Sequence, residues 1–252
     1  MNFGPSILVT GAASGIGAAF VRRIAAPGVR LMLHTRGNLE GLNAVASAAR
    51  SQGAEVAIEL GDLADPSVPV GLVHKARAIF GRVDQLVSNA GKAQSATFDS
   101  LESHELQSAF ASMPVAFFHL AKTALPDLCT SPQGRIVAVS SFVAHSFGKN
   151  NVHFPATSAA KAALEALAKC LAVQLAPAGV TVNCVVPGFV RKDPCRHAAT
   201  STVAWESARA ASPNGRLGEP QDIAELVAFL LSRAARHITG QAIHIDGGLL
   251  LP

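Results

Sequence analysis

Short apolar runs alternate with longer amphipathic stretches along the whole chain. The runs are continuously hydrophobic, which is typical of strands buried on both faces of a parallel sheet. They occupy residues 6–10, 29–34, 55–60, 83–89, 134–141, 180–187 and 241–246. Apolar positions with a helical period cover residues 15–26, 39–51, 67–80, 103–127, 157–176 and 220–233.

This alternation of strand and helix predicts an α/β fold, a single doubly wound parallel sheet with helices on both faces. No linker rich in Pro and Gly divides the chain, and no repeat of fixed period appears. We therefore expect residues 1–252 to form one domain. Pro114 lies inside a predicted helix and should disturb it, because proline lacks the backbone donor.

Composition narrows the class of protein. Hydrophobic residues make up 49% and charged residues 15% of the chain, which argues against disorder. The net charge of +4 comes without a basic stripe, so no nucleic-acid partner is expected. There is no apolar stretch of about 18 residues and no basic N-terminal region, so we expect neither membrane insertion nor export, but a cytoplasmic protein.

The cysteines have no metal-binding pattern. Cys129, Cys170, Cys184 and Cys195 show no C-x-x-C spacing, so neither a metal site nor a disulfide framework is expected. Cys170 and Cys184 stand in apolar contexts and are interpreted as core residues.

The first strand is followed by a glycine-rich turn, "TGAASGIG" at residues 10–17, which opens the first helix. Gly11, Gly15 and Gly17 allow a tight turn and let backbone N–H groups approach a pyrophosphate, with Ser14 and Ile16 completing the loop. The strand–turn–helix context predicts a dinucleotide-binding Rossmann fold.

The spacing of these glycines resembles the short-chain dehydrogenase/reductase family. Further segments occur in that family's order: "GDL" (61–63), "SNAG" (88–91), "VSS" (139–141), "VVPG" (185–188) and "NGRLGEPQDIAELVAFLLS" (214–232). The resemblance covers essentially the whole chain. It implies a cytosolic NAD(P)(H) oxidoreductase acting on a small molecule, usually as a homodimer or homotetramer.

The resemblance also implies which residues contact the cofactor. Besides the glycine loop and Lys161, they are Asp62, Leu63, Asn89, Ala90, Gly91, Pro187 and Gly188. After the second strand, Arg36 follows Thr35, and residues 33–38 contain no acidic side chain. Because a guanidinium suits a 2′-phosphate, NADP(H) is favoured over NAD(H), unless Arg36 is only a solvated loop residue.

The family's catalytic set is a serine, a tyrosine, a lysine and an asparagine, and here two members are replaced. Ser141 matches the serine and Lys161 the lysine, whose role is to hold the nicotinamide ribose. Thr157 stands in the place of the tyrosine and Met113 in that of the asparagine, and the chain contains no tyrosine at all. A threonine hydroxyl is a poor general acid, and Thr157 could equally cap the helix.

The segment between Ser141 and Lys161 offers other proton donors. His153 and His145 are candidates because imidazole titrates near neutrality, although both could be surface residues, as we expect for Lys149. Phe154 precedes Lys161 by seven residues, the interval between tyrosine and lysine in bacterial enoyl reductases.

Aromatic residues near these positions predict an apolar substrate pocket. Phe142, Phe154 and Phe189 are its expected walls, with Ala93, Phe147 and Val190 nearby. Residues 189–213 are expected to form a lid, in which Trp205 either closes over the substrate or packs in the core. Arg191, Lys192 and Arg196 are expected in solvent, with contact to an anionic substrate group as the alternative.

The sequence therefore predicts an NADP(H)-dependent oxidoreductase that transfers hydride to or from a carbonyl or alcohol, as a 3-oxoacyl reductase does, with a degenerate catalytic tetrad. One alternative is an enoyl- or dienoyl-type C=C reductase. Another is a catalytically inactive NADP(H)-binding sensor or partner subunit.

Overall fold

The computed structural model describes residues 4–148, 153–191 and 202–251, and side chains in all of these except residues 202–205. Its seven described strands form one parallel sheet in the order β3-β2-β1-β4-β5-β6-β7. The strands are β1 (Ser6–Thr10), β2 (Arg30–Thr35), β3 (Glu55–Leu60), β4 (Gln85–Ser88), β5 (Arg135–Val139), β6 (Thr181–Pro187) and β7 (Ala242–Ile245).

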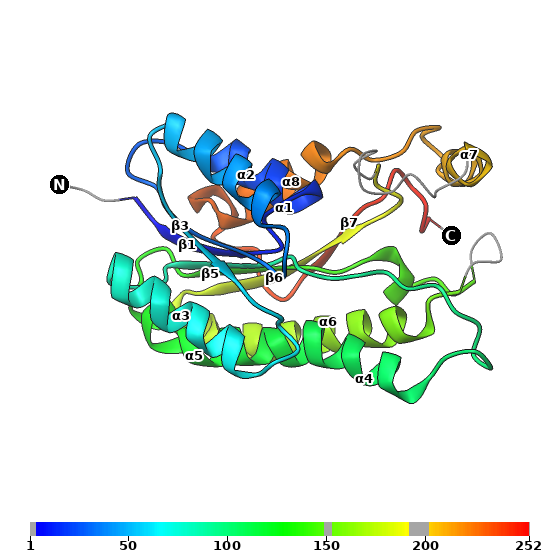
Figure 1. The fold of residues 1–252 in the computed structure, drawn as a ribbon, viewed down its shortest axis with the longest axis horizontal. Coiled ribbons are helices and arrows are strands. Elements are labelled where there is room, and N and C mark those ends of the chain that lie inside the picture. Colours follow the sequence, from blue (N-terminus) through cyan, green and yellow to red (C-terminus); the bar gives the residue numbers. More distant parts are fainter. Residues whose placement is uncertain (1–3, 149–152, 192–201, 252) are drawn as a thin grey trace.

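Helices cover both faces of this sheet (Figure 1). They are α1 (Gly15–Ile24), α2 (Leu39–Ser51), α3 (Ser67–Phe80), α4 (Ser103–Phe110), α5 (Ala116–Thr130), α6 (Pro155–Leu175), α7 (Thr202–Ala211) and α8 (Pro220–Leu231). One layer contains α1, α2 and α8, the other α3, α5 and α6, and a hydrophobic core lies between the sheet and each layer. The predicted doubly wound α/β fold is confirmed.

The predicted helix over residues 103–127 is divided. Between α4 and α5 the backbone forms a π-helical turn, η1 (Ala111–Val115), which contains Pro114. The N–H of Ala116 reaches back five residues to the carbonyl of Ala111. The expected disturbance by proline is thus absorbed as a π-bulge, and the chain continues into α5 without a break.

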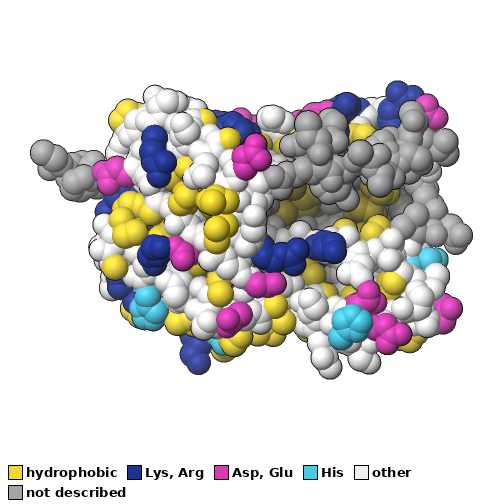
Figure 2. All heavy atoms as spheres, viewed as in Figure 1, with side chains coloured by type: hydrophobic (Ala, Val, Ile, Leu, Met, Phe, Trp, Pro, Cys, Tyr) yellow, Lys and Arg dark blue, Asp and Glu magenta, His cyan; other side chains and the backbone are white. Residues whose placement is uncertain are grey.

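One property expected from composition comes out differently. Cys184 is buried on β6 as predicted, but the prediction for Cys170 was wrong because its side chain is exposed on the outer face of α6. Charges of both signs are interspersed over the face in Figure 2. Among the described helices, none is long and apolar enough to cross a membrane.

The sheet topology fixes where a site can form. The order of strands reverses between β1 and β4, so the loops that leave these two strands diverge and open a crevice at the carboxyl edge. The glycine turn, Asn89, Ser141 and Gly188 all follow strands at this edge. The predicted site residues are therefore gathered there by topology.

Candidate active site

The glycine turn is shaped by positive backbone angles and close packing. Gly11 and Gly15 have φ of 66° and 54°, a region that disfavours other residues. A Cβ on Gly17 would lie 2.3 Å from the carbonyl oxygen of Gly11. Ser14 precedes α1 with an exposed side chain that makes no capping bond, and the first N–H groups of α1 are left for a ligand.

Asn89 ties this turn to the end of β4. Its amide nitrogen donates to the carbonyls of Thr10 and Gly11, both at 3.0 Å. The hydroxyl of Thr10 in turn accepts from the backbone N–H groups of Asn89 and Ala90. These bonds connect the loop after β1 to the loop after β4, and the two loops form the two sides of the crevice.

Arg36 and Asp62 meet at the ends of β2 and β3. Their nearest charged atoms, Nη1 and Oδ2, are 3.9 Å apart, and the side chains are 72% and 52% exposed. An ion pair this long and exposed contributes little, so the guanidinium is free to turn to a ligand. Leu63 is buried next to Asp62 in the chain. His34 at the end of β2 is also buried, and its burial lowers the pKa of the ring, which contacts the carbonyl of Gly61.

Lys161 is a buried ammonium at the centre of the carboxyl edge. Its Nζ donates to the carbonyl of Val139 at 2.6 Å, and burial lowers its pKa to about 8. A Cβ placed on Gly91 would lie 3.0 Å from this nitrogen and 3.5 Å from the sulfur of Met113. The lysine, the loop after β4 and the methionine in the asparagine's place are thus neighbours.

The two candidate hydroxyls differ in what they bind. Ser141 precedes a short 3-10 turn and accepts from the N–H of Val143 at 3.4 Å. Thr157 is buried, accepts from the N–H of Gln94 at 3.2 Å, and donates to the carbonyl of Lys92 at 3.5 Å. Thr157 therefore anchors the loop after β4 through these two bonds, in place of the helix-cap bond that was the alternative.

The two candidate histidines point to different surroundings. His153 is exposed, with its ring beside Gly148. His145 contacts the carboxylate of Glu165 with Nε2 at 2.9 Å and packs against the ring of His244. Lys149 lies outside the described residues.

Glu165 is the polar residue that sequence reasoning missed. It lies on α6 four residues after Lys161, is 4% exposed, and also accepts a hydrogen bond from Ser140. The available signal was a carboxylate in an apolar helix, on the same face as Lys161. Within the described part of the chain, no group of three acidic, histidine or cysteine side chains could hold a metal ion.

The predicted pocket phenylalanines do come together. Phe142 and Phe189 pack with ring centroids 4.6 Å apart, and Phe154 packs against the same small cluster. Phe147 does not join them, because its side chain is 76% exposed.

Gly188 follows Pro187 at the end of β6 and packs closely against Asp246, where a Cβ would lie 2.8 Å from its Cα. Arg191 forms a surface ion pair with Glu219 at 2.9 Å. The described part of the expected lid includes α7, while Lys192, Cys195, Arg196 and the side chain of Trp205 lie outside the described residues.

Solved structures share this whole architecture. A short-chain dehydrogenase/reductase of Serratia marcescens superposes with a TM-score of 0.90 at 30% identity, covering 98% of each chain. A short-chain dehydrogenase of Burkholderia cenocepacia in complex with NADP gives the same three values. A family model described as "Enoyl-(Acyl carrier protein) reductase" matches residues 11–250. The chain belongs to the short-chain dehydrogenase/reductase family.

Members of this family are NAD(P)-dependent oxidoreductases, as the glycine turn and its surroundings indicated. Among curated members, the 3-oxoacyl-[acyl-carrier-protein] reductase FabG of Escherichia coli K12 is 34% identical over 252 residues, covering both chains completely. The protein of the same name from Staphylococcus aureus Mu50 is 31% identical over 251 residues.

Proposed function

We propose that this short-chain dehydrogenase/reductase is NADP(H)-dependent and transfers hydride between the nicotinamide and the carbonyl of a 3-oxoacyl-type substrate. The observation that carries the proposal is a buried Lys161 at the same edge of the sheet as an intact glycine turn. The full-length similarity to 3-oxoacyl reductases supports the substrate class.

The residues present fit the cofactor. The N–H groups of residues 14–17 would hold the pyrophosphate, since the turn lacks side chains that would block its approach. The exposed, weakly paired Arg36 would hold the 2′-phosphate, and related structures carry NADP and NADPH. Lys161 would hold the nicotinamide ribose. When bound, NADPH supplies the hydride.

Ser141 would polarise the substrate carbonyl. Among the described residues its oxygen accepts only a long bond, from the N–H of Val143, so the hydroxyl proton remains available to donate to the carbonyl oxygen. The cluster of Phe142, Phe154 and Phe189 would pack against the apolar part of an acyl chain.

Lys161 is our candidate for the proton donor in place of the missing tyrosine. The hydroxyl of Thr157 is a poor general acid, His145 faces Glu165, and His153 is exposed to solvent. The pKa of Lys161, lowered by burial to about 8, lies in the range that suits a general acid near neutral pH.

The test is anaerobic oxidation of NADPH with a 3-oxoacyl thioester, comparing wild type with Lys161→Arg. Arginine keeps the positive charge but does not release a proton, so NADPH should still bind while turnover falls about 10²–10⁴-fold. Wild-type turnover should fall as pH rises through about 8, because the ammonium is then lost. Thr157→Ser, which keeps the hydroxyl, is the matched control.

A Lys161→Arg enzyme with unchanged turnover would contradict the role of Lys161. Tight NADPH binding without turnover on any carbonyl or C=C substrate would instead favour a non-catalytic binding protein.

Reduction of a conjugated C=C bond is the second candidate. It is favoured by the description of the matching family model and by the interval between Phe154 and Lys161. An enolate formed by hydride addition needs stabilisation before protonation, which a serine and a buried ammonium can provide. The same assay with a 2-enoyl thioester separates the two reactions.

A further inference from the structure

We propose that a cleft at the amino edge of the sheet, remote from the carboxyl edge that carries the candidate active site, binds a phosphate or phosphomonoester anion. The cleft has a volume of about 570 Å³ and is lined by Arg135, Gly179, Ala234, Arg236 and His237. Arg135 begins β5, Gly179 precedes β6, and the other three residues follow α8. The proposal does not depend on the proposed function.

Within the described part of the chain, Arg135 is a buried cation without an acidic partner. Its residue is 5% exposed, and Nη1 donates to the carbonyls of Gly134 at 2.7 Å and Gly179 at 3.2 Å. Its Nε is enclosed and has no hydrogen-bond partner among the described residues. Burial lowers its pKa, and no described carboxylate opposes that effect. A buried charge without a counter-charge is unfavourable, and an anion in the cleft would relieve it.

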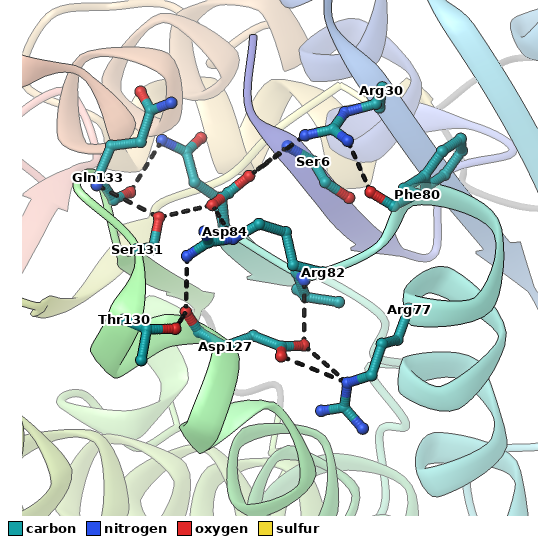
Figure 3. Close-up of polar contacts among 12 residues, drawn as sticks. Ser6, Arg30, Arg77, Phe80, Arg82, Asp84, Asp127, Thr130, Ser131 and Gln133 are labelled. Carbon is teal, nitrogen blue, oxygen red and sulfur yellow. Dashed lines mark hydrogen bonds and ion pairs between the residues drawn. The ribbon is translucent and has the colours of Figure 1, made fainter. Parts of the chain in front are cut away.

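Neighbouring arginines at the same edge are neutralised (Figure 3). Arg82 lies 2.8 Å from Asp84, which Arg30 also approaches, and Arg77 lies 3.1 Å from Asp127. The Asp84 carboxylate additionally accepts from the backbone of Ser6 and the hydroxyl of Ser131. This edge therefore pairs its partly buried guanidinium groups with carboxylates, and Arg135 departs from that rule.

The rim of the cleft adds two further donors. Arg236 and His237 are exposed, and among the described residues Arg236 makes only a 3.5 Å bond, to the carbonyl of Arg233. The carbonyl of Gly179 is turned to Arg135 and its N–H to Ala176, so neither group repels or competes with a ligand. Two guanidinium groups and an imidazole on one small cleft match the several oxygens of a phosphate.

The test is calorimetric titration of the full chain with inorganic phosphate at constant ionic strength. We expect saturable binding by wild type and a loss of at least about tenfold in affinity in Arg236→Gln/His237→Gln, because charge-assisted hydrogen bonds are removed. Both side chains are exposed, so this variant should fold normally. Arg22→Gln, which removes an exposed charge outside the cleft, is the control and should bind as wild type does.

The candidate cofactor site must be excluded as the source of binding. Phosphate binding should survive Arg36→Gln and the presence of saturating NADPH. Loss in Arg36→Gln, equal loss in Arg22→Gln, or no binding by wild type would overturn the proposal. Titration with glycerol 3-phosphate then identifies the source, because tighter binding than inorganic phosphate points to a phosphomonoester and weaker binding to the free ion.

Discussion

Gly17 lies where the first turn of α1 comes closest to the end of β1. A methyl group there would meet the carbonyl of Gly11 at 2.3 Å and the amide of Asn89 at 2.7 Å, and the backbone carbonyl cannot easily yield. We expect Gly17→Ala to lower stability by about 1–3 kcal/mol and to weaken NADPH binding, measured by denaturant unfolding and cofactor titration.

The matched control is Gly71→Ala on α3, where a Cβ meets nothing within 4 Å. Alanine should stabilise that helix by about 0.5–1 kcal/mol without affecting cofactor binding. Equal effects of the two substitutions would contradict the steric argument for Gly17.

Lys161 should give the free energy of unfolding a distinct pH dependence. Its pKa is about 8 in the folded protein against an ordinary 10.5, so between these values the unfolded chain binds the extra proton. Stability from this group therefore rises with pH across that window, by up to about 3 kcal/mol. Below pH 8 the burial cost of the charge is fully present.

Lys161→Met should lack this rise, and the difference between wild type and variant, followed by urea unfolding from pH 7 to about 10.5, isolates it. The absence of tyrosine removes one other group that would titrate in this window. Parallel curves for the two proteins would show that the lysine's pKa is not lowered.

Motifs located the glycine turn and Lys161, but the surroundings of Thr157 and His145 could not be predicted from sequence. Each depends on how α6 sits against distant segments. The bonds of Thr157 reach residues more than 60 positions away, and His145 meets Glu165 across 20. Local pattern carries no information on such approaches, because they follow from packing.

At the scale of elements, the seven strand positions were predictable because each is a continuous apolar run between turns. Boundaries differ by one to two residues where strand hydrogen bonding stops before the apolar run ends, as in β5, predicted over 134–141 and observed over Arg135–Val139. The division of residues 103–127 was foreseen only as a disturbance at Pro114. A π-bulge keeps the helix direction, and no sequence rule selects it over a kink.

Glu165 joins α6 to β5 and to the loop that follows it. Its carboxylate accepts from Ser140 and His145 in a nearly solvent-free setting. We expect Glu165→Ala to lower the free energy of unfolding by about 1–3 kcal/mol, because it leaves the buried hydroxyl of Ser140 without its acceptor and removes the contact of the partly exposed His145. Glu165→Gln keeps an acceptor and should lose less, as measured by urea unfolding. Equal losses would show that the hydrogen bonds do not carry the effect.

At the scale of the molecule, the sheet separates two kinds of polar edge. The carboxyl edge keeps backbone N–H groups, Arg36 and Lys161 available for ligands, whereas the amino edge pairs the partly buried Arg30, Arg77 and Arg82 with carboxylates. This asymmetry follows from parallel strands, which place all loops that leave the strands on one side. Arg135, which has no carboxylate partner among the described residues, is therefore an exception at the amino edge, whereas an unpaired cation at the carboxyl edge would not be unusual.

The outer face of the layer formed by α5 and α6 is expected to mediate self-association. Phe118 on α5 is 44% exposed, and Leu167 and Val173 on α6 are 38% and 79% exposed. Large apolar side chains exposed on the outside of a helical layer are typical of subunit interfaces. If the chain is a homodimer or homotetramer through this face, Phe118→Asp combined with Val173→Asp should shift it to smaller species, because buried like charges would face each other across a symmetric contact. Light scattering coupled to size-exclusion chromatography measures the change.

Leu39→Asp, on the opposite layer and 45% exposed, is the control and should leave the mass unaltered. A wild-type monomer, or a double variant of unchanged mass, would rule out this interface.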